Sequence, residues 1–239
     1  MSYPWSLLTD TGRLRENNED AGNAWPEIHL FAVADGMGGH VAGEVASNVA
    51  LQAVYDVVGH ARKPRNATQE EELLGAAVGA ANDAVRREAE VRKLDGMGTT
   101  LTVLRVRNRT VVASHVGDTR LYLVKPDELV QLTKDHNMVA LLVEAGAVAP
   151  ERAHTHPDRH LLTRAIGTHP DVEVDTLRAP IPRGARLLLS TDGLHDVVPE
   201  SEIHRLASQD DLERATRGMI EAANREGGPD NITVLLLEP

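Results

Sequence analysis

Acidic residues recur in this sequence where apolar runs meet glycine, asparagine or another acidic residue. They are Glu19 beside Asp20, Asp35 before Gly36, Asp118 after Gly117, Asp192 before Gly193, and Asp230 before Asn231. Any one of these carboxylates alone is best explained as a turn residue, because Asp and Gly are common in turns. Their repetition indicates instead that several strand ends hold carboxylates in fixed positions, where functional side chains are often placed.

Carboxylates that converge from several strand ends repel one another unless cations neutralise them. All-oxygen ligands suit Mg²⁺ or Mn²⁺. Two such ions, roughly 3.5–4 Å apart and bridged by one carboxylate, can hold a hydroxide for in-line attack on a phosphoryl centre. The residue types therefore predict a two-metal site, provided that the fold brings these strand ends together.

The stretch ADGMGGH at residues 34–40 could instead form a phosphate-binding turn or a nucleotide loop. Gly36 and Gly38 fit the start of a GxGxxG pattern, but Val41 occupies its last glycine position. The nucleotide interpretation is therefore disfavoured. His40 is interpreted as a capping or packing residue.

The composition limits the class of protein. The chain has 239 residues, of which 41% are apolar, 26% charged and 3% aromatic, so we expect a globular protein with an aliphatic core. A net charge of -11 argues against a nucleic-acid binder, and the absence of cysteine excludes a thiol nucleophile and thiolate metal sites. No segment reaches the roughly 18 apolar residues of a membrane span. We expect a cytoplasmic protein with neither nucleic acid nor membrane as a partner.

Hydrophobic patterns predict the elements that must position the carboxylates. An apolar run at 28–34 predicts a buried strand, and helices are expected over 41–59, over 68–93 with Thr68 as its cap, and over 211–226. Runs at 99–107, 110–116 and 120–124 predict an antiparallel meander, and further strands are expected at 185–190 and 231–237. This order favours a mixed α+β sandwich over a doubly wound parallel sheet.

Eight motifs occur along the chain in a single order. They are TDTGRLRENNED, FAVADGMGGHVAGEVAS, GMGTTLTVL, SHVGDTRLYLV, LTKDH, HPDRHLLTRAIG, LLLSTDGL and PDNITVLLL. Together they resemble the metal-dependent serine/threonine protein phosphatases of the protein phosphatase 2C (PPM) family in their bacterial form. Because the motifs run from Arg15 to Asn231, the resemblance implies one phosphatase domain over residues 1–239. It also implies an α+β fold of two packed antiparallel sheets flanked by α-helices, a four-layer α/β/β/α sandwich.

The resemblance further implies two Mn²⁺ or Mg²⁺ ions in the core site. Asp35 would bridge both ions, and Asp192 and Asp230 would bind the first. Glu19 and the backbone carbonyl of Gly36 would bind the second.

Three further residues acquire roles from the same resemblance. Asp118, together with Asp192, matches a third, weaker metal site. Asp20 matches a residue that orients metal-bound water without touching an ion. Arg15 corresponds to the phosphate-binding arginine, although a solvated loop cation would otherwise be its simplest interpretation.

The resemblance implies direct hydrolysis, in which a hydroxide bridging the metal ions attacks phosphorus and the Ser or Thr alkoxide leaves. Eukaryotic relatives often have a histidine as proposed proton donor where this chain has Met37. A thioether cannot donate a proton, so we assign no protein general acid and expect water to serve. The expected substrates are phosphorylated proteins, namely a bacterial Ser/Thr kinase and its targets, and the expected state is a monomer.

Other interpretations remain open. The histidines of HTHPDRH at 154–160 could bind zinc, but this segment matches the family's flap, which Lys134, Asp135 and His136 open. A catalytically silent phosphoprotein-binding relative is disfavoured because every ligand position is acidic. A phosphatase of anti-anti-sigma partner proteins is disfavoured by Arg15 and the full set of motifs.

Overall fold

The computed structural model describes residues 3–39 and 41–239. His40, which the sequence assigned to capping or packing, lies outside the described residues, as do the side chains of Val41 and His154.

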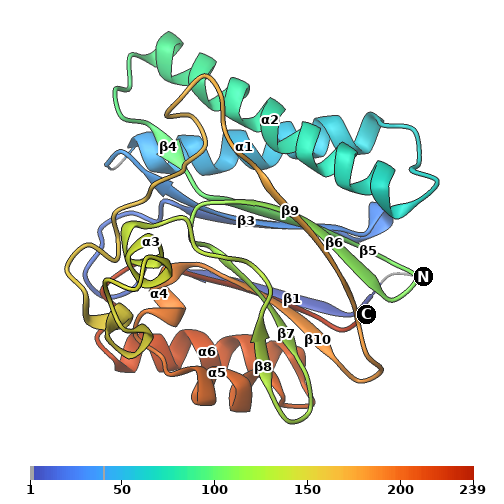
Figure 1. The fold of residues 1–239 in the computed structure, drawn as a ribbon, viewed down its shortest axis with the longest axis vertical. Coiled ribbons are helices and arrows are strands. Elements are labelled where there is room, and N and C mark those ends of the chain that lie inside the picture. The colour runs from blue at the N-terminus through green and yellow to red at the C-terminus, as the bar shows by residue number, and fades with distance from the viewer. Residues whose placement is uncertain (1–2, 40) are drawn as a thin grey trace.

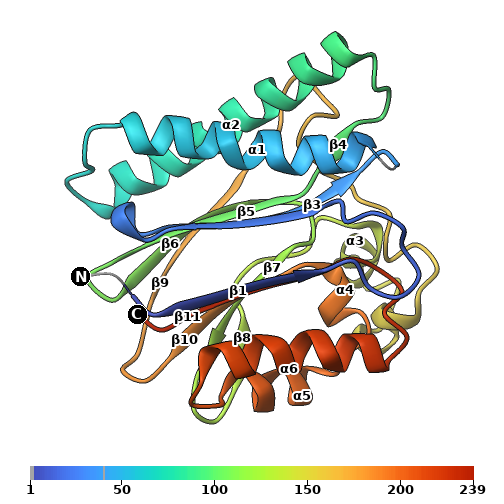
Figure 2. The same cartoon turned by 180° about the vertical axis from the view of Figure 1, so that it is seen from behind.

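Two antiparallel sheets pack face to face between two layers of helices (Figures 1 and 2). The first sheet has the strand order β2-β3-β5-β6-β9, with β4 paired to β3, and the second has the order β1-β11-β10-β7-β8. Helices α1 and α2 cover the first sheet, and α5 and α6 cover the second. The predicted α+β sandwich of two antiparallel sheets flanked by helices is confirmed.

The strands of the first sheet are β2 (Asp20–Trp25), β3 (Leu30–Met37), β4 (Gly98–Thr99), β5 (Leu101–Arg107), β6 (Thr110–Val116) and β9 (Asp175–Pro180). Those of the second are β1 (Trp5–Asp10), β7 (Arg120–Val124), β8 (Leu129–Gln131), β10 (Arg186–Ser190) and β11 (Ile232–Leu237). The helices are α1 (Val41–His60), α2 (Ala67–Arg92), α3 (Met138–Glu144), α4 (Asp192–His195), α5 (Glu200–Ala207) and α6 (Leu212–Arg225), with 3-10 turns η1 (Pro26–Ile28) and η2 (Pro150–Thr155).

Strand β3 shows why its sequence is apolar without alternation. Phe31 and Val33 face the second sheet, whereas Ala32 and Ala34 face α1 and α2. Successive side chains of a strand point to opposite faces, so a strand covered on both sides must be apolar throughout. This buried strand leads directly to Asp35.

The predicted meander is only partly correct. Strands β5 and β6 pair with each other, but β7 pairs with β10 and β8 in the second sheet. The chain crosses between sheets at residues 117–119, where Gly117 has φ 106° and a Cβ would lie 2.5 Å from the Thr100 side chain. Only glycine accommodates this crossing, which places Asp118 between the two sheets.

The three helices expected from the sequence, α1, α2 and α6, lie within one residue of their predicted bounds. The predicted N-cap of α2 is wrong. Helix α2 begins at Ala67 because the side chain of Asn66 accepts a hydrogen bond from the Gln69 N–H at 2.9 Å. Asn66, rather than Thr68, is therefore the cap. Helix α6 is capped in the same way by Asp211.

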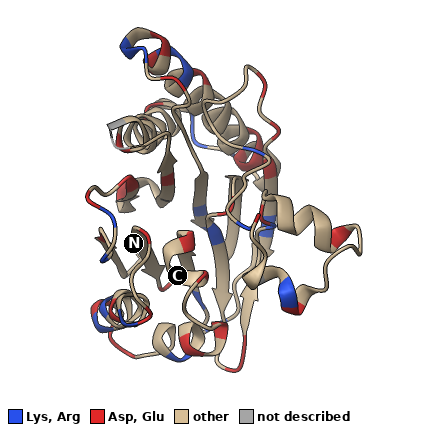
Figure 3. Ribbon diagram, turned by 90° about the vertical axis from the view of Figure 1, so that its left-hand side faces the viewer, with Lys and Arg blue, Asp and Glu red and all other residues tan. Residues whose placement is uncertain are grey.

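Lys and Arg lie interspersed with Asp and Glu along the helices (Figure 3). Across residues 3–39 and 41–239, no helix has the length and apolar content needed to cross a membrane.

The only phenylalanine of the sequence lies in the core between the sheets, so its truncation should strongly destabilise the protein. Phe31 is fully buried there, so Phe31→Ala is expected to lower the free energy of unfolding by about 3–5 kcal/mol through lost contacts and a cavity. Denaturant unfolding measures this loss. The control Val91→Ala, at a side chain 79% exposed, should stay within about 0.5 kcal/mol of the parent. A loss below about 1 kcal/mol for Phe31→Ala would contradict the described packing.

Candidate active site

Most of the residues singled out by the sequence line one cavity of about 480 Å³. They are Arg15, Glu19, Asp35, Gly36, Asp118, Asp192 and Asp230. Asp35 and Gly36 lie in β3 of the first sheet and Asp192 begins α4, whereas the other four lie in loops next to strands of either sheet. Asp20 does not line this cavity, and it lies buried behind the wall with 7% of its surface exposed.

Asp20 links the two sheets beneath the cavity. It is the cross-strand partner of Asp35 in the β2–β3 pair. Its Oδ2 accepts a hydrogen bond from the Thr191 hydroxyl at 2.8 Å, and that hydroxyl accepts one from the Thr233 N–H at 2.9 Å. Asp20 is thereby fixed between the first sheet and β10–β11 of the second.

The backbone of Asp35 is held by two threonines that the sequence analysis did not single out. Its N–H donates to the Thr100 hydroxyl at 2.9 Å. Its carbonyl accepts from the Thr99 hydroxyl at 2.9 Å and from the Thr100 N–H at 2.8 Å. These three bonds fix the strand end, so the carboxylate has little freedom to move away from its neighbours.

Gly36 permits a close approach of three chain segments. A Cβ at this position would lie 2.1 Å from the carbonyl oxygen of Gly43 in α1 and 2.5 Å from that of Glu19. The Gly36 N–H donates to the Glu19 carbonyl at 3.1 Å. Any side chain at 36 would therefore push Glu19 away from Asp35.

Asn231 organises the loop that carries Arg15 and Glu19. Its Oδ1 accepts from the Glu19 N–H at 2.8 Å, and its Nδ2 donates to the carbonyls of Thr11 and Asn17, both at 2.9 Å. On that loop, Arg15 is 51% exposed and contacts Asp230 with an NH2–Oδ2 distance of 2.7 Å. One amide thus aligns the first loop of the chain with the last.

Burial sets the electrostatics of the cluster. It raises the pKa of Asp35 and of Asp118 well above the ordinary value, and repulsion from Asp192 adds to both shifts. It also raises the pKa of Asp20 to about 7. Burial and Asp192 raise the pKa of Asp230, although Arg15 partly offsets them.

The donor set fits hard divalent cations. Within the described residues, Oδ1 of Asp20 and Oδ1 of Asp192 are buried without a hydrogen-bond partner. Buried acceptors without donors are costly, and so are like charges held together. Cations bound among these oxygens would relieve both costs, and oxygen ligands are those that Mg²⁺ and Mn²⁺ prefer.

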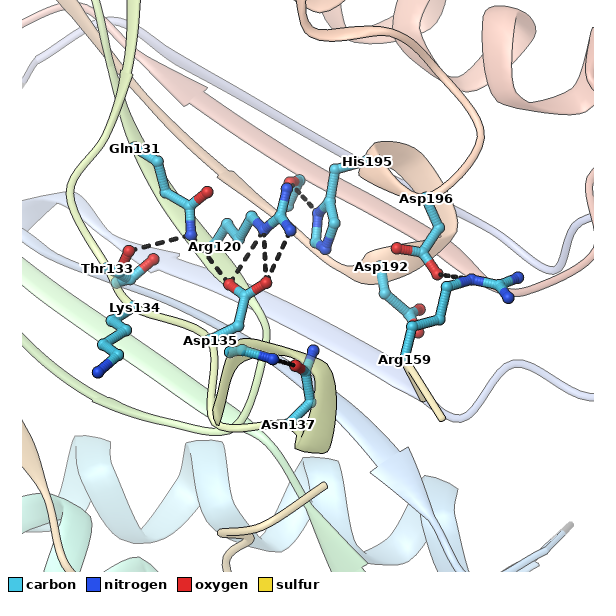
Figure 4. Close-up of polar contacts among 12 residues, drawn as sticks. Arg120, Gln131, Thr133, Lys134, Asp135, Asn137, Arg159, Asp192, His195 and Asp196 are labelled. Atoms are coloured by element: carbon cyan, nitrogen blue, oxygen red, sulfur yellow. Dashed lines mark hydrogen bonds and ion pairs between the residues drawn. The ribbon is translucent and has the colours of Figure 1, made fainter. Parts of the chain in front are cut away.

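Two residues that follow η2 reach across to α4. The Arg159 Nε lies 3.2 Å from Asp196 Oδ2, as Figure 4 shows. The His160 Nδ1 lies 3.4 Å from that same oxygen and 3.6 Å from Asp192 Oδ2, and its interaction with Asp192 raises the pKa of His160. His160, Asp192 and Asp196 therefore place possible ligand atoms within 4.8 Å of one another.

The other described histidine of the segment 154–160 has a different partner. The His156 Nδ1 accepts a hydrogen bond from the Asp158 N–H at 3.2 Å, and among the described residues the group that could hold a metal ion contains His160 but not His156. Met37, at the end of β3, lines the cavity with a thioether.

Sequence reasoning missed two groups of residues here. Thr99, Thr100, Thr191 and Asn231 lie inside the motifs already quoted, beside the singled-out acids, and that adjacency was the available signal. The sequence marks His160 only as a possible zinc ligand within HTHPDRH. Its contact with Asp196, like that of Arg159, arises because the chain folds the flap back onto α4, for which the sequence offers no local signal.

Comparisons with known proteins agree on one family. The family model described as Protein phosphatase 2C matches residues 13–236. The serine/threonine phosphatase stp of Listeria innocua is 40% identical over 235 residues, covering 96% of this chain and 93% of that protein. The serine/threonine protein phosphatase PstP of Mycobacterium tuberculosis is 39% identical over 98% of this chain, which spans only 44% of that protein's length.

Solved structures show the same similarity. The crystal structure of the Mycobacterium tuberculosis phosphatase PstP/Ppp matches with a TM-score of 0.92 and 38% identity, covering 100% of this chain and 99% of that one. The catalytic domain of PstP in complex with two manganese ions matches with a TM-score of 0.88 and 36% identity, covering 99% and 98%.

The raised pKa values predict how pH affects the metal-free protein. An unfolded Asp titrates near 3.8, so the stability associated with protonated Asp20 is fully present below that pH and is lost as pH rises through about 7. Bound Mn²⁺ should remove this loss, so we expect Mn²⁺ to raise the melting temperature more at about pH 8 than at about pH 5. Thermal unfolding with Mn²⁺ or with chelator measures the difference.

The variant Asp20→Asn is the matched comparison for that measurement, because it removes the titrating group and keeps its shape. It should flatten the pH dependence of the metal-free protein over this range. An unchanged pH dependence would show that Asp20 titrates normally.

Proposed function

Because the chain belongs to the protein phosphatase 2C family of bacterial serine/threonine protein phosphatases, we propose that its cavity hydrolyses phosphoserine and phosphothreonine by direct attack of water on phosphorus. The observation that carries this proposal is that Arg15 lines the same cavity as carboxylates from several strand ends and loops. No covalent phosphoenzyme is required, and the chain has no cysteine to form one through sulfur.

The family is metal-dependent, and we propose two Mn²⁺ or Mg²⁺ ions in this cavity. Asp35 would be shared by both ions, Asp192 and Asp230 would hold one, and Glu19 with the Gly36 carbonyl would hold the other. A third, weaker site would use Asp118 with Asp192. When bound, the ions supply an acidic water as nucleophile and positive charge against the phosphoryl oxygens.

Arg15 is proposed to bind the phosphate. A guanidinium can donate two parallel hydrogen bonds to a phosphoryl group, and such charge-assisted pairs are among the stronger ones. Its contact with Asp230 holds it at the cavity, and its half-exposed position leaves donors free for a substrate. The same guanidinium would offset negative charge that builds up during attack.

Asp20 is proposed to act from behind the cavity wall. Its hydrogen bond from Thr191 and its pairing with Asp35 support a role in orienting water at the site. No side chain is proposed as general acid at Met37, because a thioether cannot donate a proton. Protonation of the leaving alkoxide is assigned to water.

The biological setting extends the same proposal. The substrates would be proteins phosphorylated by bacterial Ser/Thr kinases, encountered in the cytoplasm by a monomer. We also propose that residues 1–239 form one catalytic domain, which is supported by a cavity lined by residues from Arg15 through Asn231.

Removal of one carboxylate tests the metal site. Asp192→Asn is expected to weaken Mn²⁺ binding and to reduce kcat for p-nitrophenyl phosphate by about a hundredfold or more, because one core ion and the third ion would both lose a charged ligand. Calorimetric titration and steady-state kinetics measure the two effects. The control Asp127→Asn, in an exposed turn, should match the parent. Wild-type activity that survives exhaustive chelation would overturn the metal-dependent mechanism.

Removal of the guanidinium tests phosphate binding. Arg15→Ala should raise KM for p-nitrophenyl phosphate about tenfold, since an exposed charge-assisted contact contributes on the order of 1–2 kcal/mol to substrate binding. The control Arg183→Ala removes an exposed cation from the turn before β10 and should leave KM unchanged. A parental KM in the Arg15 variant would remove this residue from the phosphate site.

A further inference from the structure

A second cavity of about 860 Å³ adjoins the first, between the flap and the core of the second sheet. Arg159, Asp196 and Val197 line both cavities, so the two spaces meet at the end of α4. A protein substrate whose phosphoryl group occupies the first cavity would therefore extend neighbouring residues toward the second.

Apolar side chains form the facing walls of this second cavity. Val139, Ala140 and Val143 of α3 lie on the flap side, and Val197 and Val198 lie on the core side. Such walls suit the aliphatic part of a side chain, which gains free energy as it leaves water. They offer nothing to a compact, strongly hydrated anion.

The polar groups at the base of the cavity are already satisfied. The Arg120 Nε and NH2 donate to Asp135 at 3.0 and 2.7 Å, and Gln131 Nε2 donates to Asp135 Oδ1 at 2.9 Å (Figure 4). Burial and the nearby Arg120 lower the pKa of His195 well below its usual value, which keeps its ring neutral. This base therefore contributes no net charge that would attract an anion.

The charged residues that line the second cavity include one more carboxylate than cations. The lining contains three cations, Arg120, Lys134 and Arg159, and four carboxylates, Asp135, Glu144, Asp196 and Glu200. Each cation has a carboxylate partner: Arg120 with Asp135, Lys134 with Glu144 at 2.6 Å, and Arg159 with Asp196. Across the described residues, no cation pairs with Glu200, at the start of α5.

We propose that this second cavity receives the side chain of a lysine or arginine that flanks the phosphorylated residue of the protein substrate. The aliphatic stem would lie along Val139, Val143 and Val197, and the charged head would reach Glu200. Long cationic side chains bury their stems in this manner while their heads stay in polar surroundings. The inference rests on the proposed phosphatase function and assigns it a sequence preference.

The lining of the second cavity disfavours binding of an acidic residue beside the phosphorylated one. Its carboxylate would meet Glu200 without a free cation to offset the repulsion, since the three cations are already paired. Discrimination between substrates gains from such repulsion as well as from attraction.

Phosphothreonine peptides provide the test. Each peptide carries one lysine, norleucine or glutamate at one flanking position, and all flanking positions are tested in turn. The kcat/KM of each peptide is divided by the kcat/KM of p-nitrophenyl phosphate, which is too small to span both cavities. At one or more positions, the relative kcat/KM of the lysine peptide is expected to exceed that of the glutamate peptide by about tenfold. The lysine peptide gains one exposed ion pair, and the glutamate peptide suffers one repulsion. Glu200→Gln should reduce that ratio to about twofold, whereas the control Glu202→Gln, which removes a carboxylate paired with Arg205, should keep it.

A second pair of variants tests the space itself. Ala140→Trp fills the cavity, and the matched control Leu141→Trp lies at a 47% exposed position of the same helix outside the lining. We expect the first variant to lower the peptide-to-nitrophenyl ratio for the best lysine peptide about tenfold and the second to leave it near the parental value.

The outcomes distinguish a failure of the proposed sequence preference from a failure of the proposed phosphatase function. No metal-dependent hydrolysis of p-nitrophenyl phosphate by the wild-type protein would overturn the proposed function. Normal hydrolysis with equal rates for lysine and glutamate peptides at every position would overturn only the inference. Norleucine matching lysine would also overturn it, because the cavity would then select apolar size alone.

Discussion

Repulsion among carboxylates buried at the strand ends is the constraint to which the rest of the structure is adapted. Burial and repulsion from Asp192 raise the pKa values of Asp35 and Asp118, and buried oxygens of Asp20 and Asp192 lack hydrogen-bond donors in the described part of the chain. Side chains free to move would separate to reach water. Backbone bonds to Thr99 and Thr100, and the Asn231 clamp on the Glu19 loop, prevent that separation. The aliphatic sandwich stabilises an arrangement that is unfavourable until cations occupy it.

The sequence predicted the layers and the acids of the site because both leave local signals. An apolar run predicts a strand at 28–34, which the structure has as β3 at Leu30–Met37, after a 3-10 turn that includes Ile28. An acid beside glycine marks the last part of that strand at Asp35. The switch of β7 to the second sheet left no such signal, since it depends on how Gly117 packs against Thr100. The contacts of Arg159 and His160 with α4 depend on the position of the whole flap, which no local pattern encodes. The structure brings the proposed ligands together, whereas their individual roles stay predictions.

Chemistry and selectivity are divided between two adjoining spaces. A phosphoryl group is common to every candidate substrate, so a cavity lined by Arg15 and the proposed metal ligands cannot by itself distinguish one phosphoprotein from another. Surfaces beyond the phosphate must do so, and the flap provides one against α4 and α5. Asp192 lies in the short helix α4 and Asp196 directly after it, so a substrate that displaces Arg159 from Asp196 would also act close to the proposed metal ligand Asp192.

The position of β11 in the second sheet also determines when the site can exist. This strand, near the end of the chain, lies between β1 and β10, and Glu19 contacts Asn231 across 212 residues of sequence. During synthesis, β1 therefore emerges from the ribosome long before its only neighbour in the sheet. Its edge must wait unpaired, or be shielded by other molecules, until β11 has been translated. A nascent chain that lacks β11 would carry Arg15 and Glu19 without Asn231, which positions their loop, so the cavity would not yet be assembled.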